Sequence, residues 1–148
     1  MKKNLSHSSV PKIVILAFII ISSTPFYSSA QSPAIKPAME KLKTGIQFEN
    51  NGQYHKAIKN YQQALALFKK LRTGDAIAVS LKRIGDVYHA LGQYEKSIEN
   101  YLQALTLFRK LGIEDAIVIT LNNIGTVYHL LGQYEKSIEN YLQALTLF

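Results

Sequence analysis

The sequence has no cysteine and no tryptophan among its 148 residues, and it holds only four prolines and eight glycines. The absence of cysteine excludes a disulfide scaffold, a Cys-ligated zinc site, a thiol nucleophile and a lipid-modified N-terminal cysteine. So few prolines and glycines exclude a collagen-like or proline-rich chain. Hydrophobic residues make up 47% of the sequence, which is more than intrinsically disordered chains contain. The length is that of a single domain.

The formal charge is +7, from 17 Lys and Arg against 10 Asp and Glu. Three of the lysines lie within the first twelve residues, and the other basic residues are scattered along the sequence. A nucleic-acid-binding protein usually carries a clustered basic stripe. We therefore expect no nucleic-acid partner.

The longest uninterrupted apolar run is the nine residues Ile13–Ile21, too short for a membrane-spanning helix, which needs about 20. Lysines precede this run, and the small residues Ser-Ser-Ala follow it at 28–30. These are the three parts of a secretory signal peptide. Residues 1–30 are therefore predicted to direct export to the periplasm or medium, with cleavage after Ala30. An uncleaved N-terminal anchor is the alternative, and we expect membrane contact only through this segment.

Residues 31–37 contain two prolines and are predicted to form a spacer, because proline disfavours helix at the residue before it. The rest of the chain is a repeat of 40 residues. Gly-Gln-Tyr occurs at 52, 92 and 132, and residues 91–108 and 131–148 are identical. We divide the repeats into units 38–74, 75–114 and 115–148, the last of them incomplete.

Each unit is predicted to be an antiparallel hairpin of two helices, because apolar residues recur at steps of three and four. The helices are expected near 38–51, 54–72, 75–91, 94–111, 115–131 and 134–148. Asp75 is expected to cap the first helix of the middle unit, and Gly92 to end it. In the first unit, Lys41 and Thr44 replace apolar positions, as suits a terminal repeat that faces water.

Small residues recur inside the predicted hairpins. Glycine stands in the middle of the first helix of every unit, at Gly45, Gly85 and Gly125, although it costs about 1 kcal/mol there relative to alanine. We interpret the three glycines as sites where the two helices approach closely. Second-helix residues at the same crossing are Ala57, Ser97 and Ser137. Ala64, Ala104 and Ala144 are expected to contact the next repeat.

The middle unit reads Leu81-x-x-Ile84-Gly85-x-x-Tyr88-x-x-x-Gly92-x-Tyr94-x-x-Ser97-x-x-x-Tyr101-x-x-Ala104. This pattern resembles the tetratricopeptide repeat, whose short form has a period of about 34 residues. The 40-residue period resembles the longer-helix variant of that repeat. The resemblance implies an all-α fold, a right-handed superhelix of stacked hairpins (an α-solenoid), with the first helices lining a concave groove.

In such proteins the groove holds a peptide or a partner segment. The resemblance implies that polar residues of the first helices form this site, and Asn123 is similar to the family's backbone-binding asparagine. Basic residues on these helices would favour an acidic ligand. The alternative is an ordinary solvated polar face. The candidate residues are Lys43, Lys82, Arg83, Asp86, His89, Asn122, Asn123, Thr126 and His129.

Nothing in the sequence indicates an enzyme, a metal site or a cofactor. The GxxxxGK[ST] and GxGxxG motifs are absent, and the four histidines do not have the spacing of metal ligands. We therefore expect an exported scaffold that binds a protein or peptide segment. The alternative is the N-terminal repeat region of a longer bacterial protein that carries a C-terminal CHAT-type peptidase domain.

The last repeat keeps the apolar residues of the middle one, although no further repeat follows it in this sequence. Tyr141, Leu142, Leu145 and Phe148 are expected to lie on a face that, in the middle repeat, the third repeat buries. Uncovered apolar faces of this kind mark interfaces or aggregation sites. The sequence therefore predicts self-association through the C-terminal helix.

Overall fold

The computed structural model describes residues 33–147, all of which except Pro33 belong to a compact unit that comprises Ala34–Phe148. This described part contains six α-helices and no strand. The predicted signal peptide and residues 31–32 of the spacer lie outside the described residues. The helices are α3 (Lys36–Asn50), α4 (Tyr54–Leu71), α5 (Gly74–Ala90), α6 (Tyr94–Leu111), α7 (Glu114–Leu130) and α8 (Tyr134–Leu145).

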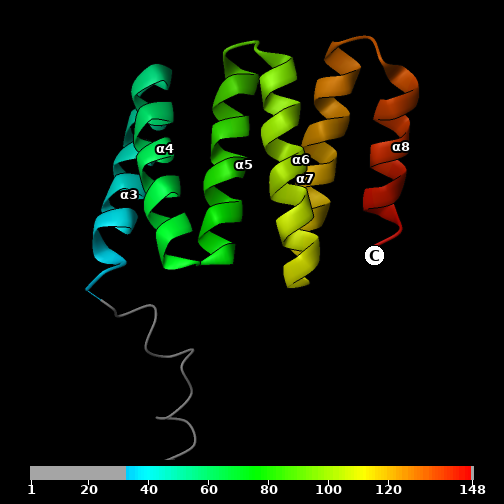
Figure 1. Cartoon of the computed structure of the whole chain (residues 1–148). Helices are drawn as coiled ribbons and strands as arrows, with labels where there is room; N and C mark the ends of the chain where they lie inside the picture. The colour runs from blue at the N-terminus through cyan, green and yellow to red at the C-terminus, as the bar shows by residue number, and fades with distance from the viewer. Residues whose placement is uncertain (1–32, 148) are drawn as a thin grey trace, which may run out of the picture. The chain divides into compact units, whose positions relative to one another are not determined.

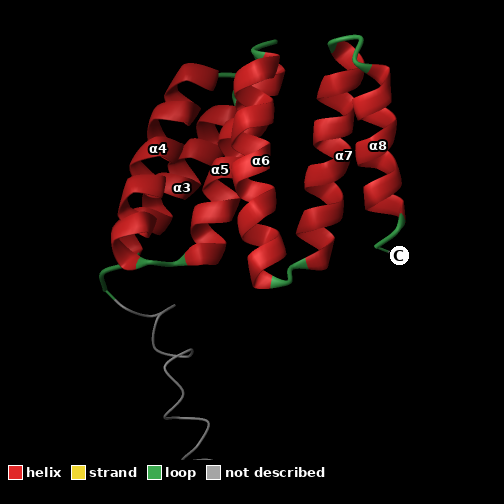
Figure 2. Ribbon diagram, turned by 45° about the vertical axis from the view of Figure 1, so that its right-hand side comes forward, coloured by secondary structure: helices red, strands yellow, loops and turns green. Residues whose placement is uncertain are grey.

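The helices pair in sequence order as three antiparallel hairpins, α3–α4, α5–α6 and α7–α8 (Figures 1 and 2). Contacts between α4 and α5, and between α6 and α7, stack each hairpin on the next. The predicted fold class, an all-α solenoid of helical hairpins, is confirmed. No helix among residues 33–147 has both the length and the apolar character needed to cross a membrane.

Each hairpin turns at a glycine in the left-handed region of backbone conformation. Gly92 has φ +69°, as the sequence predicted, and its N–H donates to the His89 carbonyl at 2.9 Å. The connections between hairpins use the same conformation, at Arg72 with φ 56° and at Gly112 with φ 68°. Arg72 is the one non-glycine residue with positive φ among the described residues. An L-residue with a side chain pays an energetic cost for this conformation.

Most helix ends lie within one residue of the prediction, and three helices differ from it in ways that have a physical or structural reason. The first helix, α3, starts two residues early, at Lys36, because Pro37 fits the first turn, where its missing N–H is not needed. Asp75 does not cap α5: the helix starts at Gly74, the N-cap is Thr73, and Asp75 lies in the first turn. At that position its carboxylate favours the helix through the macrodipole. The last helix, α8, ends at Leu145, and Phe148 lies outside the described residues.

The mid-helix glycines make room for a tyrosine ring from the second helix of the same hairpin. A Cβ atom on Gly85 would lie 2.7 Å from Tyr101, and one on Gly125 would lie 2.7 Å from Tyr141. The buried Ser97 hydroxyl lies at the same crossing and donates to the Gly85 carbonyl at 2.9 Å. The close approach predicted at these glycines is therefore confirmed, and the ring is its immediate cause.

The contact between the second and third hairpins is an apolar cluster that contains Leu105 and Phe108 of α6 together with Ile117 and Leu121 of α7. This confirms that the third hairpin covers the second.

One packing assignment was wrong. Leu142 does not belong to a face that the next hairpin would bury, because its counterpart Leu102 is 44% exposed with the third hairpin in place. The expected contact of the alanines with the next repeat is seen at Ala104, which shares a buried cluster with Ile117 of α7. Ala144 is buried although no described helix follows α8, so its burial does not depend on a following repeat. Helical periodicity alone does not distinguish the two sides of a second helix.

Candidate peptide-binding face

The nine predicted site residues lie on α3, α5 and α7, the first helices of the three hairpins, and together we call them the first-helix face. Lys43, Asn122 and His129 are exposed, and the other six are half-buried. The structure joins some of these side chains in polar networks and leaves others in contact with solvent. The two groups therefore have different roles.

Asp86 is the centre of the first network. The ammonium group of Lys82, one turn earlier on α5, lies 2.9 Å from Oδ2 of Asp86 and 3.2 Å from Oδ1. The hydroxyl of Tyr101 on α6 donates to Oδ1 at 2.7 Å, and Nδ2 of Asn123 on α7 donates to it at 3.3 Å. One carboxylate thus links three helices from two hairpins.

Glu49 has the same function one hairpin earlier. Its Oε2 accepts a hydrogen bond from the Tyr61 hydroxyl of α4 and lies 3.6 Å from Nη1 of Arg83 on α5. At each of the two hairpin boundaries, a first-helix carboxylate therefore binds a tyrosine of its own hairpin and a polar side chain of the next. Arg83 and Asn123 occupy the same position of the repeat.

Both tyrosine hydroxyls are held as donors. Burial, reinforced by the hydrogen bond from its hydroxyl to Glu49, raises the pKa of Tyr61 far above its usual value. Burial and the negative charge of Asp86 do the same to the pKa of Tyr101. Ionisation would place a second negative charge beside a carboxylate in a poorly solvated position.

The third hairpin has no such carboxylate. Thr126 stands where the second hairpin has Asp86, and its Oγ1 lies 3.1 Å from the Tyr141 hydroxyl. Thr126 also donates to the backbone carbonyl of the exposed Asn122 at 2.9 Å. This end of the first-helix face is therefore neutral, and it presents amide and hydroxyl groups.

The two candidate histidines lie in the last turns of α5 and α7. Each contacts the tyrosine that opens the following helix: the ring centroids of His89 and Tyr94 are 6.1 Å apart, and those of His129 and Tyr134 are 5.3 Å apart. The described residues contain no group of three or more His, Asp or Glu side chains that could hold a metal ion.

The charge of the face differs from what the sequence alone indicated. The sequence predicts that Lys82 and Arg83 favour an acidic ligand. In the structure both side chains are paired with carboxylates of this chain. Lys43 is the candidate cation for which no ion pair is found among the described residues. The physical reason for an acidic ligand is correspondingly weaker.

Sequence reasoning missed three members of the networks, Glu49, Tyr61 and Tyr101. The tyrosines gave a signal, because they recur 40 residues apart and one helix away from the mid-helix glycines, but their periodicity placed them in the apolar stripe. Glu49 gave none, since it stands at the repeat position occupied by His89 in the second unit.

A family model described as tetratricopeptide repeat matches residues 45–110 and, again, 76–148. The chain belongs to the tetratricopeptide repeat family. Its 40-residue units are thus tetratricopeptide repeats, as the resemblance implied. No curated protein matches the chain by sequence.

Solved structures of other tetratricopeptide repeat proteins are similar to this one. The TPR domain of Arabidopsis FLU matches with a TM-score of 0.72 and 24% identity, over 77% of this chain and 96% of that one. The TPR2AB domain of yeast Sti1 matches with a TM-score of 0.65 and 27% identity, over 74% and 40%. The Rap conjugation gene regulator of plasmid pLS20 matches with a TM-score of 0.68 and 18% identity, over 91% and 36%.

Proposed function

We propose that this protein is an exported tetratricopeptide scaffold that binds a protein or peptide segment across its first-helix face. Two of the similar structures support a peptide ligand, since the Sti1 domain was solved as a pHSP90 complex and the Rap regulator with the Phr* peptide. Tetratricopeptide repeats are generally scaffolds without catalytic activity, and we propose no catalysis for this one.

The observation that carries the proposal is the fixed position of Asn123 beside the exposed Asn122. The bond to Asp86 uses one N–H of the Asn123 amide. An amide has a second N–H and a carbonyl oxygen, which together can bind the backbone of an extended peptide. Because Asp86 also holds Lys82 and Tyr101, the amide is oriented before any ligand arrives, and this lowers the entropic cost of binding.

A peptide library displayed on phage and selected against residues 31–148 tests this proposal. We expect selected peptides to lose affinity several-fold in the Asn122→Ala and Lys43→Ala variants, because both side chains are exposed on the first-helix face. The control is Glu99→Ala, an exposed position on a second helix. The proposal would be contradicted if the selected peptides bound both first-helix variants with wild-type affinity but lost affinity for the Glu99→Ala variant. If the selected peptides are acidic, we expect the Lys43→Ala variant to lose this preference, because Lys82 and Arg83 are already paired.

Export is the second part of the proposal, and its basis is the order of lysines, apolar run and small residues before Gln31. Expression of the full chain in a bacterium with a general secretion system is expected to give a periplasmic product that begins at Gln31. N-terminal sequencing checks the cleavage site. A soluble cytoplasmic product that still carries Met1 would contradict export, and a membrane-bound product with Met1 would favour the uncleaved anchor.

We also propose that the chain self-associates through α8, where Tyr141 and Leu145 are exposed. Exposed apolar side chains on one helix form the kind of patch that marks an interface. Sedimentation velocity of residues 31–148 is expected to show association that depends on concentration, and Leu145→Glu should abolish it. A wild-type chain that stays monomeric at high concentration would contradict this proposal.

A further inference from the structure

The first hairpin carries almost all of the excess positive charge of the described residues. Between residues 34 and 73 there are eight Lys or Arg and two Glu, whereas residues 74–148 hold six Lys or Arg and eight Asp or Glu. All eight cations of the first hairpin are exposed, and none of them forms an ion pair among the described residues. The basic residues that look scattered in the sequence are therefore concentrated in the fold.

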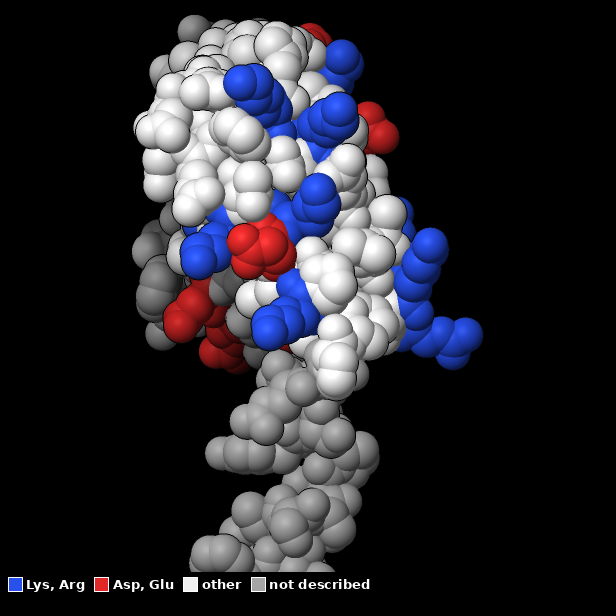
Figure 3. All heavy atoms as spheres, turned by 90° about the vertical axis from the view of Figure 1, so that its left-hand side faces the viewer, with Lys and Arg blue, Asp and Glu red and all other residues white. Residues whose placement is uncertain are grey.

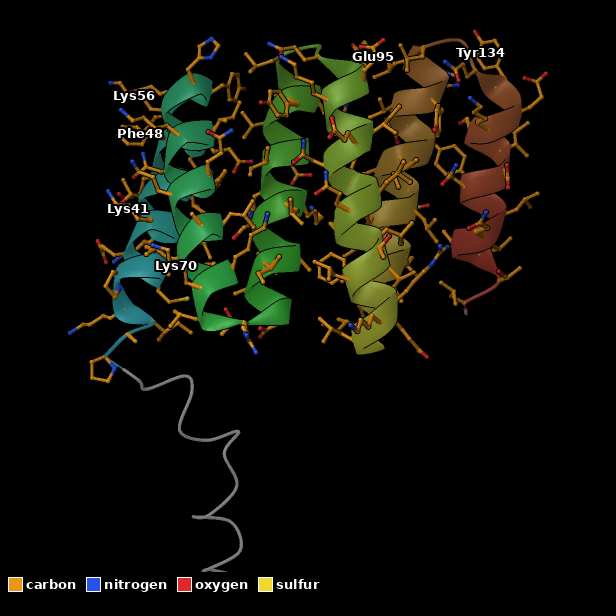
Figure 4. The ribbon with its side chains drawn as sticks, viewed as in Figure 1. Lys41, Phe48, Lys56, Lys70, Glu95 and Tyr134 are labelled. Carbon is orange, nitrogen blue, oxygen red and sulfur yellow. The ribbon has the colours of Figure 1, made fainter. Side chains whose placement is uncertain are left out.

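Several of these lysines lie on the side of the first hairpin that faces away from the second. Lys41 occupies the repeat position of Leu81, which is buried in the apolar core beside Leu65 of the preceding hairpin. Lys56 lies over the ring of Phe48, with 5.4 Å from the ammonium nitrogen to the ring centroid. Figure 3 views this side of the molecule, where Lys and Arg predominate, and Figure 4 labels Lys41, Phe48 and Lys56. We use the name basic end face for four exposed lysines of this terminal hairpin, Lys41, Lys56, Lys59 and Lys70.

A terminal repeat needs a polar outer face for solubility, but this need does not fix the sign of the charge. In the other two hairpins, the first turns of the second helices carry charges of both signs. The second hairpin has Glu95, Lys96 and Glu99 in the first turns of α6, and the third hairpin has the same three residue types in α8. The first hairpin has histidine, lysine and lysine at these positions. Both glutamates are replaced, so the end face is selectively cationic.

We propose that the basic end face binds the surface of an anionic lipid bilayer. Basic clusters beside a membrane segment are attracted to acidic headgroups, and each lysine near the surface contributes. Only 14 residues separate Lys36 from the apolar run that ends at Ile21, and these span at most about 50 Å when extended. If that run is retained as the uncleaved anchor, the alternative to cleavage after Ala30, the first hairpin is the folded element nearest to the bilayer. The face would then add a second membrane contact to the N-terminal segment.

The composition of the face fits lipid better than nucleic acid. Seven of the eight cations are lysines, which act as compact point charges, whereas nucleic-acid sites favour arginine and exposed stacking aromatics. The aromatic side chains Phe48 and Tyr54 of this hairpin are half-buried.

Sedimentation with lipid vesicles tests the proposal on residues 31–148, which retain the whole compact unit and lack the apolar run. The chain is expected to bind vesicles that contain phosphatidylglycerol, to lose that binding at high salt, and to leave pure phosphatidylcholine vesicles unbound. The His55→Glu, Lys59→Glu variant introduces the two glutamates that the second hairpin has at these positions, Glu95 and Glu99. We therefore expect it to fold. It should reduce the partition coefficient about tenfold or more.

The matched control is Glu95→His, Glu99→Lys, which makes the opposite exchange on the second hairpin. This variant has a higher net charge, but its basic end face is unchanged. We therefore expect Lys59→Glu to reduce vesicle binding in this variant as much as it does in the wild-type chain. The proposal fails if phosphatidylglycerol vesicles are not bound, if binding follows net charge regardless of which hairpin carries it, or if duplex DNA is bound at a salt concentration where the vesicles are not.

Discussion

The second helices α6 and α8 have the same sequence over all of α8 but different surroundings, since α7 packs on α6 and no described helix packs beyond α8. Tyr101 and Leu105 of α6 are 1% and 4% exposed, whereas the equivalent Tyr141 and Leu145 of α8 are 39% and 67% exposed. Because the residues are identical, the difference comes from their surroundings: α7 covers α6, which also continues to Leu111, whereas α8 ends at Leu145.

Other positions of the two helices do not change. Ser97 and Ala104 are buried in α6, and their counterparts Ser137 and Ala144 are equally buried in α8. These small residues are covered by the first helix of their own hairpin. The comparison therefore separates two layers of packing, one within each hairpin, which every unit completes by itself, and one between hairpins, which needs a following unit.

The largest expected effect is at Leu105. Leu105→Ala should lower the free energy of unfolding by about 2–5 kcal/mol, because it leaves a cavity between α6 and α7. The identical change in α8, Leu145→Ala, should stay within about 0.5 kcal/mol, since its side chain is already in solvent. Urea denaturation followed by circular dichroism measures both. Similar losses for the two variants would show that the α8 face is covered in solution.

The second test concerns the glycines beneath the tyrosine rings. Gly85→Ala should destabilise by about 1–3 kcal/mol, because the new methyl group would press on Tyr101, which is enclosed by α7 and cannot move. At Gly125 the Tyr141 ring can swing outwards, and the better helix propensity of alanine, about 1 kcal/mol, offsets most of the strain. Thermal melts of the two variants should therefore differ, and equal melting temperatures would contradict the distinction between an enclosed and an open ring.

The third test uses pH. The pKa of Tyr101 is raised in the folded state, so its contribution to stability is complete below the unfolded value of about 10 and is lost as the pH rises above it. Each such tyrosine costs up to about 1.4 kcal/mol per pH unit in this range. Tyr101→Phe should flatten the alkaline decline in unfolding free energy. In Tyr141→Phe the decline should persist, because Tyr61 and Tyr101 remain.

The smallest expected effect compares the two connections between hairpins. Arg72 adopts the left-handed conformation that Gly112 adopts one unit later. Arg72→Gly should therefore stabilise the chain by about 0.5–1 kcal/mol, the relief of strain being reduced by the greater entropy that glycine loses on folding. Gly112→Arg should have the opposite sign. If both variants were destabilised in chemical denaturation, the arginine side chain would have a stabilising contact that outweighs the strain.

Much of this architecture could be predicted from the sequence because the repeat constrains it three times. The hairpins, their turns and the close approach at Gly85 all recur at a spacing of 40 residues, so each copy supports the others. Packing side was harder to predict: the apolar stripe includes Leu105, which needs the next hairpin, but not Leu102, which stays exposed in its presence.

The candidate face was predicted in position but not in its connections. Arg83 and Asp86 were identified as polar residues of a first helix, yet the partners that neutralise or orient them come from other helices. Glu49 lies 34 residues before Arg83, and Asn123 lies 37 residues after Asp86. Such pairs depend on how one hairpin stacks on the next, and sequence periodicity carries no information about that.

Hydrogen exchange resolved by NMR at individual amides tests the central claim most directly. Because α6 and α8 share their sequence, their intrinsic exchange rates are the same from the second residue of each helix onwards, and any difference in protection reports the structure alone. In a dilute sample of residues 31–148, we expect the amides of Tyr101–Leu105 to be protected nearly to the global unfolding free energy. The amides of Tyr141–Leu145 should exchange much faster. Equal protection of the two segments would contradict the account, because it would mean that the burial of a second helix does not depend on the hairpin that follows it.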